Sequence, residues 1–208
     1  MVPHNHPTVG IEEESAAIRV LRRGWLSQGE EVEEFENEFC DFMDLPHGHA
    51  VALSSGTSSL FLALYILKAQ NKKILFPSYV CSALRYAVAM VNAQEELIDI
   101  SNDSPNISME DIRKNSHDIS IIPHMYGIPI EIENYGNPVI EDCCQALGAK
   151  VNNKHVGLHG TVGIYSFYVT KLMTSGGQGG MLISKNKKYV DTARDYREFD
   201  LRNDNKKR

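Results

Sequence analysis

The stretch that decides the fold is HAVALSSGTSSLFLALYILKA, residues 49–69. HAVAL (49–53) is a short apolar run typical of a buried strand, and SSGTSS (54–59) is a turn of small residues. LFLALYILKA (60–69) is apolar on nearly every side, which predicts a buried helix. A strand followed by a turn and a helix is the repeating unit of an α/β protein.

Units of the same kind follow along the chain. ISMEDIRKN (107–115) predicts an amphipathic helix that Ser108 caps, with Asp111 at the capping-box distance. The other expected elements are the strands KILF (73–76), EELIDI (95–100), ISIIP (119–123) and PVIED (138–142) and the helix SALRYAVAMV (82–91). Strands that alternate with helices at this spacing predict the α/β class, with a mostly parallel sheet and helices on both faces.

The first 44 residues differ from this pattern and predict an N-terminal helical arm. Val32, Phe35 and Phe39 recur at spacings of three and four residues, as on one face of a helix, after the turn GWLSQGE (24–30). The alternation of strands and helices follows this arm. We therefore divide the chain into an arm, residues 1–44, and an α/β domain, residues 45–208.

Composition and charge limit the kinds of partner. The chain has 208 residues, 42% of them hydrophobic, which suffices for one domain with a sizeable core. Its 21 basic and 27 acidic residues give a net charge of −6, which argues against nonspecific nucleic-acid binding. The basic end, residues 185–208, is mixed in sign and predicts a solvated helix face.

Neither a membrane span nor a signal peptide is expected. The longest apolar run, Leu60 to Leu67, is far shorter than the roughly 18 residues that suggest a transmembrane helix. The start of the chain carries acids where a signal peptide has a basic start and an apolar stretch. We therefore expect a cytoplasmic protein.

The four cysteines, Cys40, Cys81, Cys143 and Cys144, show neither the C-x-x-C spacing of a metal site nor the density of a disulfide scaffold. We expect reduced thiols and no bound metal. Cys143 and Cys144 are adjacent and would point to opposite faces of an extended chain, which argues against a bond between them.

Four loops follow the carboxyl ends of expected strands: SSGTSS (54–59), FPSYVC (76–81), PHMYG (123–127) and EDCCQ (141–145). Parallel sheets bind their ligands at this edge, so we expect the four loops to converge on one rim. His124, in PHMYG, is expected to be a hydrogen-bonded structural residue rather than a proton-transfer group.

Three segments carry candidate chemistry. Gly56 permits close backbone approach, and the N–H groups that start the next helix could hold a phosphate, although small residues also cap helices that bind nothing. Glu141 and Asp142 end an apolar strand, where either a polar ligand or capping of the next turn by Asp142 would supply a partner. Lys171 lies between an aromatic strand and a glycine-rich turn. Desolvation there could make its amine a nucleophile, although most lysines are simply solvated.

Together these features match what pyridoxal 5'-phosphate (PLP) requires of a protein: a lysine for its aldehyde, an acid for its ring nitrogen, and donors for its phosphate. With these residues the chain resembles the DegT/DnrJ/EryC1/StrS aminotransferases. The motifs that carry the resemblance, in order, are GWLSQGEEVEEFENEF (24–39), VALSSGTSSLFLAL (51–64), ILFPSYVCSA (74–83), PHMYGIP (123–129), VIEDCCQALGA (139–149), GTVGIYSFYVTKLMTSGGQGGMLIS (160–184) and DYREFDLRNDNKKR (195–208).

The resemblance implies the large domain of the aspartate-aminotransferase-like (fold type I) PLP enzymes. Residues 45–208 would be this PLP-binding large domain, incomplete at its carboxyl end, with the small C-terminal domain missing. The resemblance further implies that Lys171, five residues after Ser166, bonds covalently to PLP. Asp142 would pair with the ring nitrogen, and Gln145 would lie near the ring hydroxyl.

The remaining cofactor contacts follow from the same resemblance. Gly56 and Thr57 would offer donors to the phosphate, and Ser166 would complete that cradle. The family usually has an aromatic residue that stacks on the ring where this chain has Cys81. Either Tyr79 stacks instead, or the ring rests on the smaller thiol.

The implied function is transamination of a nucleotide-linked keto sugar, with an amino acid, glutamate by analogy, as the donor. Lys171 favours transamination over dehydration, because sugar dehydratases of the family have a histidine there. Cell-surface polysaccharide biosynthesis and a homodimer are expected by the same analogy. Two alternatives stay open: a truncated, inactive fragment that binds PLP or dimerises, and a nucleotide-binding Rossmann-like domain, although the G-x-G-x-x-G fingerprint is missing.

Overall fold

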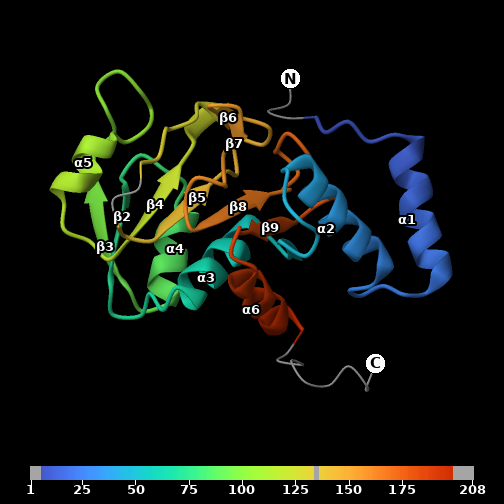
Figure 1. The fold of residues 1–208 in the computed structure, drawn as a ribbon. Helices are drawn as coiled ribbons and strands as arrows, with labels where there is room; N and C mark the ends of the chain where they lie inside the picture. Colours follow the sequence, from blue (N-terminus) through green and yellow to red (C-terminus); the bar gives the residue numbers. More distant parts are fainter. Residues whose placement is uncertain (1–5, 134–135, 199–208) are drawn as a thin grey trace.

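A computed structural model describes residues 6–133 and 136–198, and it has an α/β architecture (Figure 1). A seven-stranded sheet with the order β1-β9-β8-β5-β4-β2-β3 forms its centre. The strands are β1 (Ala50–Leu53), β2 (Lys73–Pro77), β3 (Gln94–Ile98), β4 (Ile119–Pro123), β5 (Val139–Asp142), β8 (Val162–Ser166) and β9 (Gly180–Ile183). A small hairpin, β6 (Lys150–Val151) and β7 (Lys154–His155), stands apart from the sheet.

The helices are α1 (Ile11–Arg23), α2 (Glu30–Phe42), α3 (Gly56–Ile66), α4 (Ala83–Met90), α5 (Met109–Lys114) and α6 (Lys187–Arg197), with a short 3₁₀ turn, η1 (Met125–Gly127). Ser108 caps α5 as expected, since its Oγ accepts a hydrogen bond from the backbone N–H of Asp111 at 3.0 Å. The strand expected at EELIDI (95–100) begins one residue earlier, at Gln94, and ends two residues earlier, because the ladder with β2 ends at Ile98.

The prediction of a mostly parallel sheet is confirmed. β2, β3, β4, β5 and β8 pair in parallel, and β9 lies antiparallel between β1 and β8. The carboxyl ends of β1, β2, β4, β5 and β8 therefore meet at one edge. That edge carries the loops singled out in the sequence.

Helices cover both faces of the sheet, as predicted. On one face α3, α4 and α6 pack on side chains such as Val51, Ile121 and Leu182. On the other face α2 packs against β8 and β9, and α5 packs against β2 and β4. Full burial of a leucine such as Leu60 or Leu64 contributes roughly 1.5–3 kcal/mol, so α3 is a principal source of stability.

The segment expected to be a helical arm contains two unlike helices. Phe39 and Cys40 of α2 are buried in the core beneath β8 and β9. α1 has no buried residue and meets α2 through exposed ion pairs such as Arg19 with Glu31 (Figure 1). Within the described residues, no helix is long and apolar enough to cross a membrane.

All four cysteines are free thiols. Cys143 packs in the cluster beneath α2 and Cys144 against the cluster beneath α3, which confirms that the two point to opposite faces. The segment expected to form a solvated basic face, residues 185–208, includes α6, where Lys187 and Lys188 are exposed. Arg194 and Arg197 depart from the expectation, because they bind the buried Glu36, and residues 199–208 lie outside the described residues.

Candidate functional site

A cavity of about 260 Å³ lies at the carboxyl ends of β1, β2, β4, β5 and β8. Each of the four loops predicted to converge contributes to its wall, together with the loop after β8. Of the predicted site residues, those that line the cavity are Gly56, Thr57, Cys81, Asp142, Gln145, Ser166 and Lys171. Tyr79 is half-exposed and is not part of this wall.

The amino end of α3 forms a cradle on one side of the cavity. Ser55 is the N-cap, and its Oγ accepts a hydrogen bond from the N–H of Ser58 at 3.0 Å. The N–H groups of Gly56 and Thr57 have no acceptor inside the helix, as at every helix start, and they line the cavity. The positive end of the helix dipole and these two donors favour an anion such as a phosphate.

Only glycine fits at position 56. A Cβ atom there would lie 2.8 Å from Cβ of Ser166 and 3.1 Å from Sγ of Cys144. The close approach brings the start of α3 against the end of β8. Ser166 thus adds a hydroxyl to the donors of Gly56 and Thr57 in the same wall.

Asp142, the last residue of β5, is half-buried in the cavity wall. Its Oδ1 accepts a hydrogen bond from the N–H of Cys144 at 3.0 Å. The structural and functional interpretations of this residue are therefore compatible, because one oxygen fixes the turn that follows β5. The carboxylate also acts on the Cys144 thiol, and Asp142 lines the cavity, where a ligand would meet it.

Lys171 forms another part of the wall, in the loop between β8 and β9. Its N–H donates to the carbonyl of Tyr168 at 2.8 Å, which shapes this loop. Lys171 is close enough to Cys144 to act on that thiol electrostatically, but burial and the charge of Asp142 outweigh this and raise the pKa of Cys144 well above its ordinary value. The Cys144 thiol therefore stays protonated and is a poor nucleophile.

The loops after β2 and β4 meet through a pair of tyrosines. The hydroxyl oxygens of Tyr79 and Tyr126 lie 2.8 Å apart, and the N–H of Tyr126 donates to Oε1 of Gln145 at 2.9 Å. Tyr126 adopts a left-handed conformation with φ of 57°. These contacts hold Tyr79 away from the cavity, whereas Cys81 lines it.

A buried network behind the cavity centres on Glu141, which sequence reasoning left without a role. Oε1 of Glu141 accepts hydrogen bonds from the N–H groups of His159 (2.6 Å) and Gly160 (2.5 Å), and Oε2 accepts one from Gly157 (2.7 Å). Nε2 of His124 lies 3.1 Å from Oε2. The alternation of side chains along a strand could have signalled this, because it turns Glu141 away from the face of Asp142.

His124 is a hydrogen-bonded structural residue, as predicted. Its Nδ1 accepts from the N–H of Ile130 at 3.0 Å, so Nε2 carries the proton that it donates to Glu141. Burial opposes the charge of Glu141, but the hydrogen bonds from His124, Gly160 and Gly157 outweigh it and hold the pKa of this carboxyl below its ordinary value. Glu141 is therefore ionised at neutral pH.

His124, Glu141 and Cys143 place potential metal-ligand atoms within 4.8 Å of one another. The Glu141 oxygens already accept four hydrogen bonds, and both ring nitrogens of His124 are engaged. Burial, with the charges of Glu141 and Asp142, raises the pKa of the Cys143 thiol well above its ordinary value. This trio therefore acts as a hydrogen-bonded support for the cavity.

A sequence model of the DegT/DnrJ/EryC1/StrS aminotransferase family matches residues 7–208. GDP-perosamine synthase of Vibrio cholerae is 30% identical over 203 residues, which are 92% of this chain and 54% of that protein. PLP is the cofactor of aminotransferases in this family.

Two solved structures have the same fold. An aminotransferase from Psychrobacter cryohalolentis has a TM-score of 0.84 at 27% identity, over 93% of this chain and 52% of that chain. The aminotransferase TlmJ from Streptoalloteichus hindustanus has a TM-score of 0.87 at 25% identity, over 94% of this chain and 56% of that chain. The present chain thus spans about half the length of the proteins that it matches.

Proposed function

This chain belongs to the DegT/DnrJ/EryC1/StrS aminotransferase family, and we propose that it carries the PLP-binding site of an enzyme that transaminates a nucleotide-linked keto sugar. The observation that carries the proposal is one cavity lined at once by Lys171, Asp142 and the amino end of α3. Each of these meets a different chemical requirement of PLP.

The residues of the cavity fit PLP. The cradle at Gly56, which a side chain would fill, leaves room for a phosphate beside the donors of Gly56, Thr57 and Ser166. Lys171 offers an amine for the aldehyde, and Asp142 offers a carboxylate oxygen for the ring nitrogen. Of the two candidates for contact with the ring face, Cys81 lines the cavity, which supports the thiol rather than Tyr79.

When bound, PLP supplies an aldehyde that exchanges amines and a ring that withdraws electrons from the reacting carbon. Lys171 would hold the cofactor through Nζ, and its free amine would take the proton from the α-carbon of the amino donor as a base and give it back as the ammonium acid. Asp142 would keep a proton on the ring nitrogen. Gln145, whose Oε1 accepts the N–H of Tyr126, would lie near the ring hydroxyl.

The substrate class is supported by relatives. GDP-perosamine synthase is named for a nucleotide-linked amino sugar, and this chain is 30% identical to it. We propose glutamate as the donor, a cytoplasmic location and a role in cell-surface polysaccharide biosynthesis. The alternative of a nucleotide-binding Rossmann-like domain lacks such support, because the family match favours an aminotransferase.

Cofactor binding and turnover are separate parts of the proposal. The described residues supply a cavity for PLP, whereas the chain spans about half the length of its relatives. We propose turnover for the whole enzyme, and the inactive PLP-binding fragment stays the alternative for the 208 residues alone. Assay of these residues with a panel of nucleotide-linked keto sugars and glutamate distinguishes the two.

The test of the cofactor site is covalent attachment at Lys171. We expect the protein mixed with PLP to absorb in the visible range and, after reduction with borohydride, to carry a pyridoxyl group on the peptide that contains Lys171. Lys171→Ala should lose both signals. Lys188→Ala, at an exposed position on α6, is the matched control and should keep them. A pyridoxyl group that survives in Lys171→Ala would overturn the assignment.

A further inference from the structure

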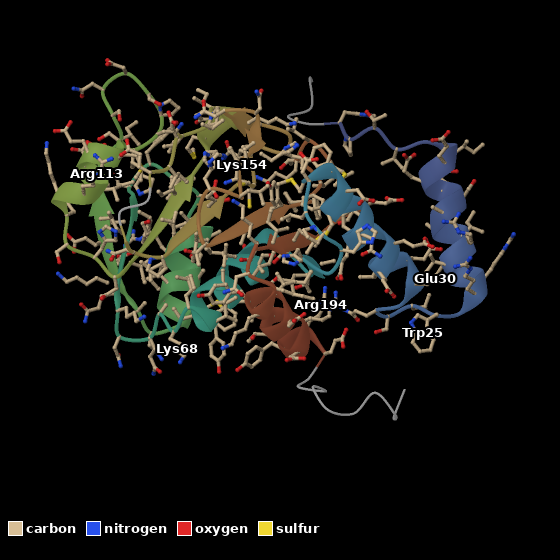
Figure 2. All side chains as sticks on the ribbon, in the orientation of Figure 1. Trp25, Glu30, Lys68, Arg113, Lys154 and Arg194 are labelled. Carbon is tan, nitrogen blue, oxygen red and sulfur yellow. The ribbon has the colours of Figure 1, made fainter. Side chains whose placement is uncertain are left out.

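A second cavity, of about 360 Å³, lies at the opposite end of the strands from the cofactor cavity. Its wall comes from residues 44–46 and His49, which precede β1, from residues 153–155 and Leu158, in and after β7, and from Lys185, which follows β9. Nδ1 of His49 is already engaged with the carbonyl of Ser184 at 2.8 Å. Figure 2 shows Lys154 beside the β6–β7 hairpin. None of the residues proposed for PLP belongs to this wall.

Two lysines line this wall. Lys154 and Lys185 lie close enough for their charges to act on one another. Within residues 6–133 and 136–198, neither lysine forms an ion pair with a carboxylate. Burial, together with Lys185, lowers the pKa of Lys154 to about 8. Two ammonium groups have only donors to offer, so this arrangement lacks an acceptor.

His155 adds a third group to the same wall. Its residue is 5% exposed, and its buried Nδ1 has no hydrogen-bond partner among the described residues. The ring packs against Phe42, with 4.9 Å between ring centroids, so it cannot turn freely toward solvent. A buried polar nitrogen without a partner costs free energy, and a ligand acceptor in the cavity would remove that cost.

The charge of the wall favours an anion. Among the residues that line the wall, two lysines stand against one acid, Asp44, which is exposed and acts electrostatically on His155. Glu141, outside the wall, also acts on Lys154, but its oxygens already accept hydrogen bonds from His124 and three backbone N–H groups. A metal cation would meet both ammonium groups at close range. An oxyanion would accept hydrogen bonds from all three nitrogen groups and would neutralise the repulsion between the lysines.

We propose that Lys154, Lys185 and His155 form a second binding site, which takes a small oxyanion of the phosphate class. The same chemistry is offered by free inorganic phosphate and by a phosphate group on a larger molecule. The site is independent of the cofactor site, because the two cavities share no residue and lie at opposite ends of β1 and β9.

The test is protection of individual lysines from acylation. The 208-residue protein is treated with acetic anhydride in sodium phosphate or in sodium chloride of equal ionic strength, and mass spectrometry measures the modification of each lysine. At phosphate concentrations about ten times the dissociation constant we expect about tenfold slower acylation of Lys154 and Lys185. Lys68 and Lys188 are exposed and lie outside the wall, so both should react equally in both salts. Lys171 reports separately on phosphate in the cofactor cavity.

A matched pair of variants tests the geometry. Lys185→Met should abolish the phosphate protection of Lys154, and Lys188→Met, which removes the same charge from a nearby exposed position, should leave it intact. Weaker protection by a nucleoside monophosphate than by phosphate would assign the site to the free ion, and stronger protection would assign it to a larger molecule. Equal modification of Lys154 in phosphate and chloride would overturn the proposal, and so would protection of Lys68 equal to that of Lys154.

Discussion

At the scale of single residues, two adjacent carboxylates have different surroundings and therefore different tasks. Glu141 is fully buried and accepts four hydrogen bonds, whereas Asp142 uses one oxygen for the N–H of Cys144 and lines the cavity. Glu141 thereby joins β5 to the end of β4 through His124 and to residues 157–160. A fixed Glu141 keeps Asp142 in place.

Glu141→Gln should destabilise the fold. Both oxygens of Glu141 accept backbone N–H groups, so either orientation of the amide places an NH₂ group against a donor. Because this breaks a buried charged network, we expect the free energy of unfolding to fall by about 3 kcal/mol. Urea unfolding at neutral pH measures the change. Glu110→Gln, on the exposed side of α5, is the control and should stay near the wild type.

The same residue predicts a dependence of stability on pH. The folded pKa of Glu141 is lower than its ordinary value of 4.5, so its contribution is complete above that value and is lost as the pH falls through the folded pKa. The difference in unfolding free energy between the wild type and Glu141→Gln should therefore shrink as the pH is lowered below 4.5. A difference that stays constant would assign the loss to packing rather than to charge.

Gly56 is the residue on which the phosphate cradle depends. In Gly56→Ala the new Cβ would lie 2.8 Å from Cβ of Ser166, so the start of α3 must shift. Overpacking of this kind costs about 1–3 kcal/mol. We therefore expect the affinity for PLP, measured by fluorescence titration, to fall about tenfold.

A comparison ligand and a control variant test whether Gly56→Ala weakens binding at the phosphate of PLP. Pyridoxal, which lacks the phosphate, should lose less affinity than PLP if the cradle holds the phosphate. Gly177→Ala should bind PLP normally, because nothing lies within 4 Å of the added Cβ and its φ is not positive. Equal losses for pyridoxal and PLP would contradict the cradle.

At the scale of elements, side chains rather than another strand form hydrogen bonds with the free edge of β1. Oε1 of Glu36, from α2, accepts the N–H of Ala52 at 2.9 Å. Arg194 and Arg197, from α6, donate to the carbonyls of Ala50 (2.7 Å) and Ala52 (3.1 Å) and also bind Glu36. Figure 2 shows Arg194 between α6 and α2. The cluster therefore satisfies an exposed strand edge and ties both helices to it.

Glu36→Gln should test this cluster. The Glu36 side chain is 7% exposed and pairs with two arginines. Its loss removes their buried partner and leaves each arginine with only a more exposed carboxylate, Asp191 or Glu198. We expect a loss of about 3 kcal/mol in unfolding free energy. Glu30→Gln, whose exposed ion pair with Arg23 joins α1 to α2, should cost less than about 1 kcal/mol. Similar losses for both variants would show that burial of the pair is not decisive.

At the scale of the whole molecule, exposed apolar side chains surround the mouth of the cofactor cavity. Tyr79, Tyr126, Tyr168 and Leu172 all belong to the loops that build the cavity or follow it, and all are exposed. Exposed apolar side chains that gather in the loops of one cavity are typical of an interface. We propose that this surface, rather than the loosely attached α1, forms the contact of a homodimer.

Leu172→Glu should therefore weaken dimerisation. A charge placed in an apolar interface must lose its water on association, so the dimer should dissociate at higher protein concentration. Sedimentation equilibrium measures the change. Ile11→Glu on α1 is a matched control, because both side chains are 79% exposed. A dimer that Ile11→Glu disrupts and Leu172→Glu spares would assign the contact to α1, and a monomeric wild type would contradict the homodimer.

The sequence by itself determined the elements and the order of the loops at the cavity. Apolar periodicity along neighbouring residues sets β1, α3, β4 and β5, and the parallel sheet that they imply brings their carboxyl ends together. Gly56 and Asp142 could therefore be expected at one edge of the sheet, whereas Lys171 was joined to them by the requirements of PLP and the resemblance to the family. These features depend on local pattern, which a sequence displays directly.

Only the tertiary structure decided which neighbour in each loop faces the cavity. It places Cys81 in the cavity wall and Tyr79 outside it. It also surrounds Glu141 with hydrogen-bond donors, bonds Arg194 to the free edge of β1 and brings Lys154 near Lys185. The reason is that each of these outcomes is set by contacts between segments far apart in the chain. The free energy of such a contact depends on how deeply the polar groups are buried and on where the partner lies. The neighbouring residues in the sequence determine neither of these.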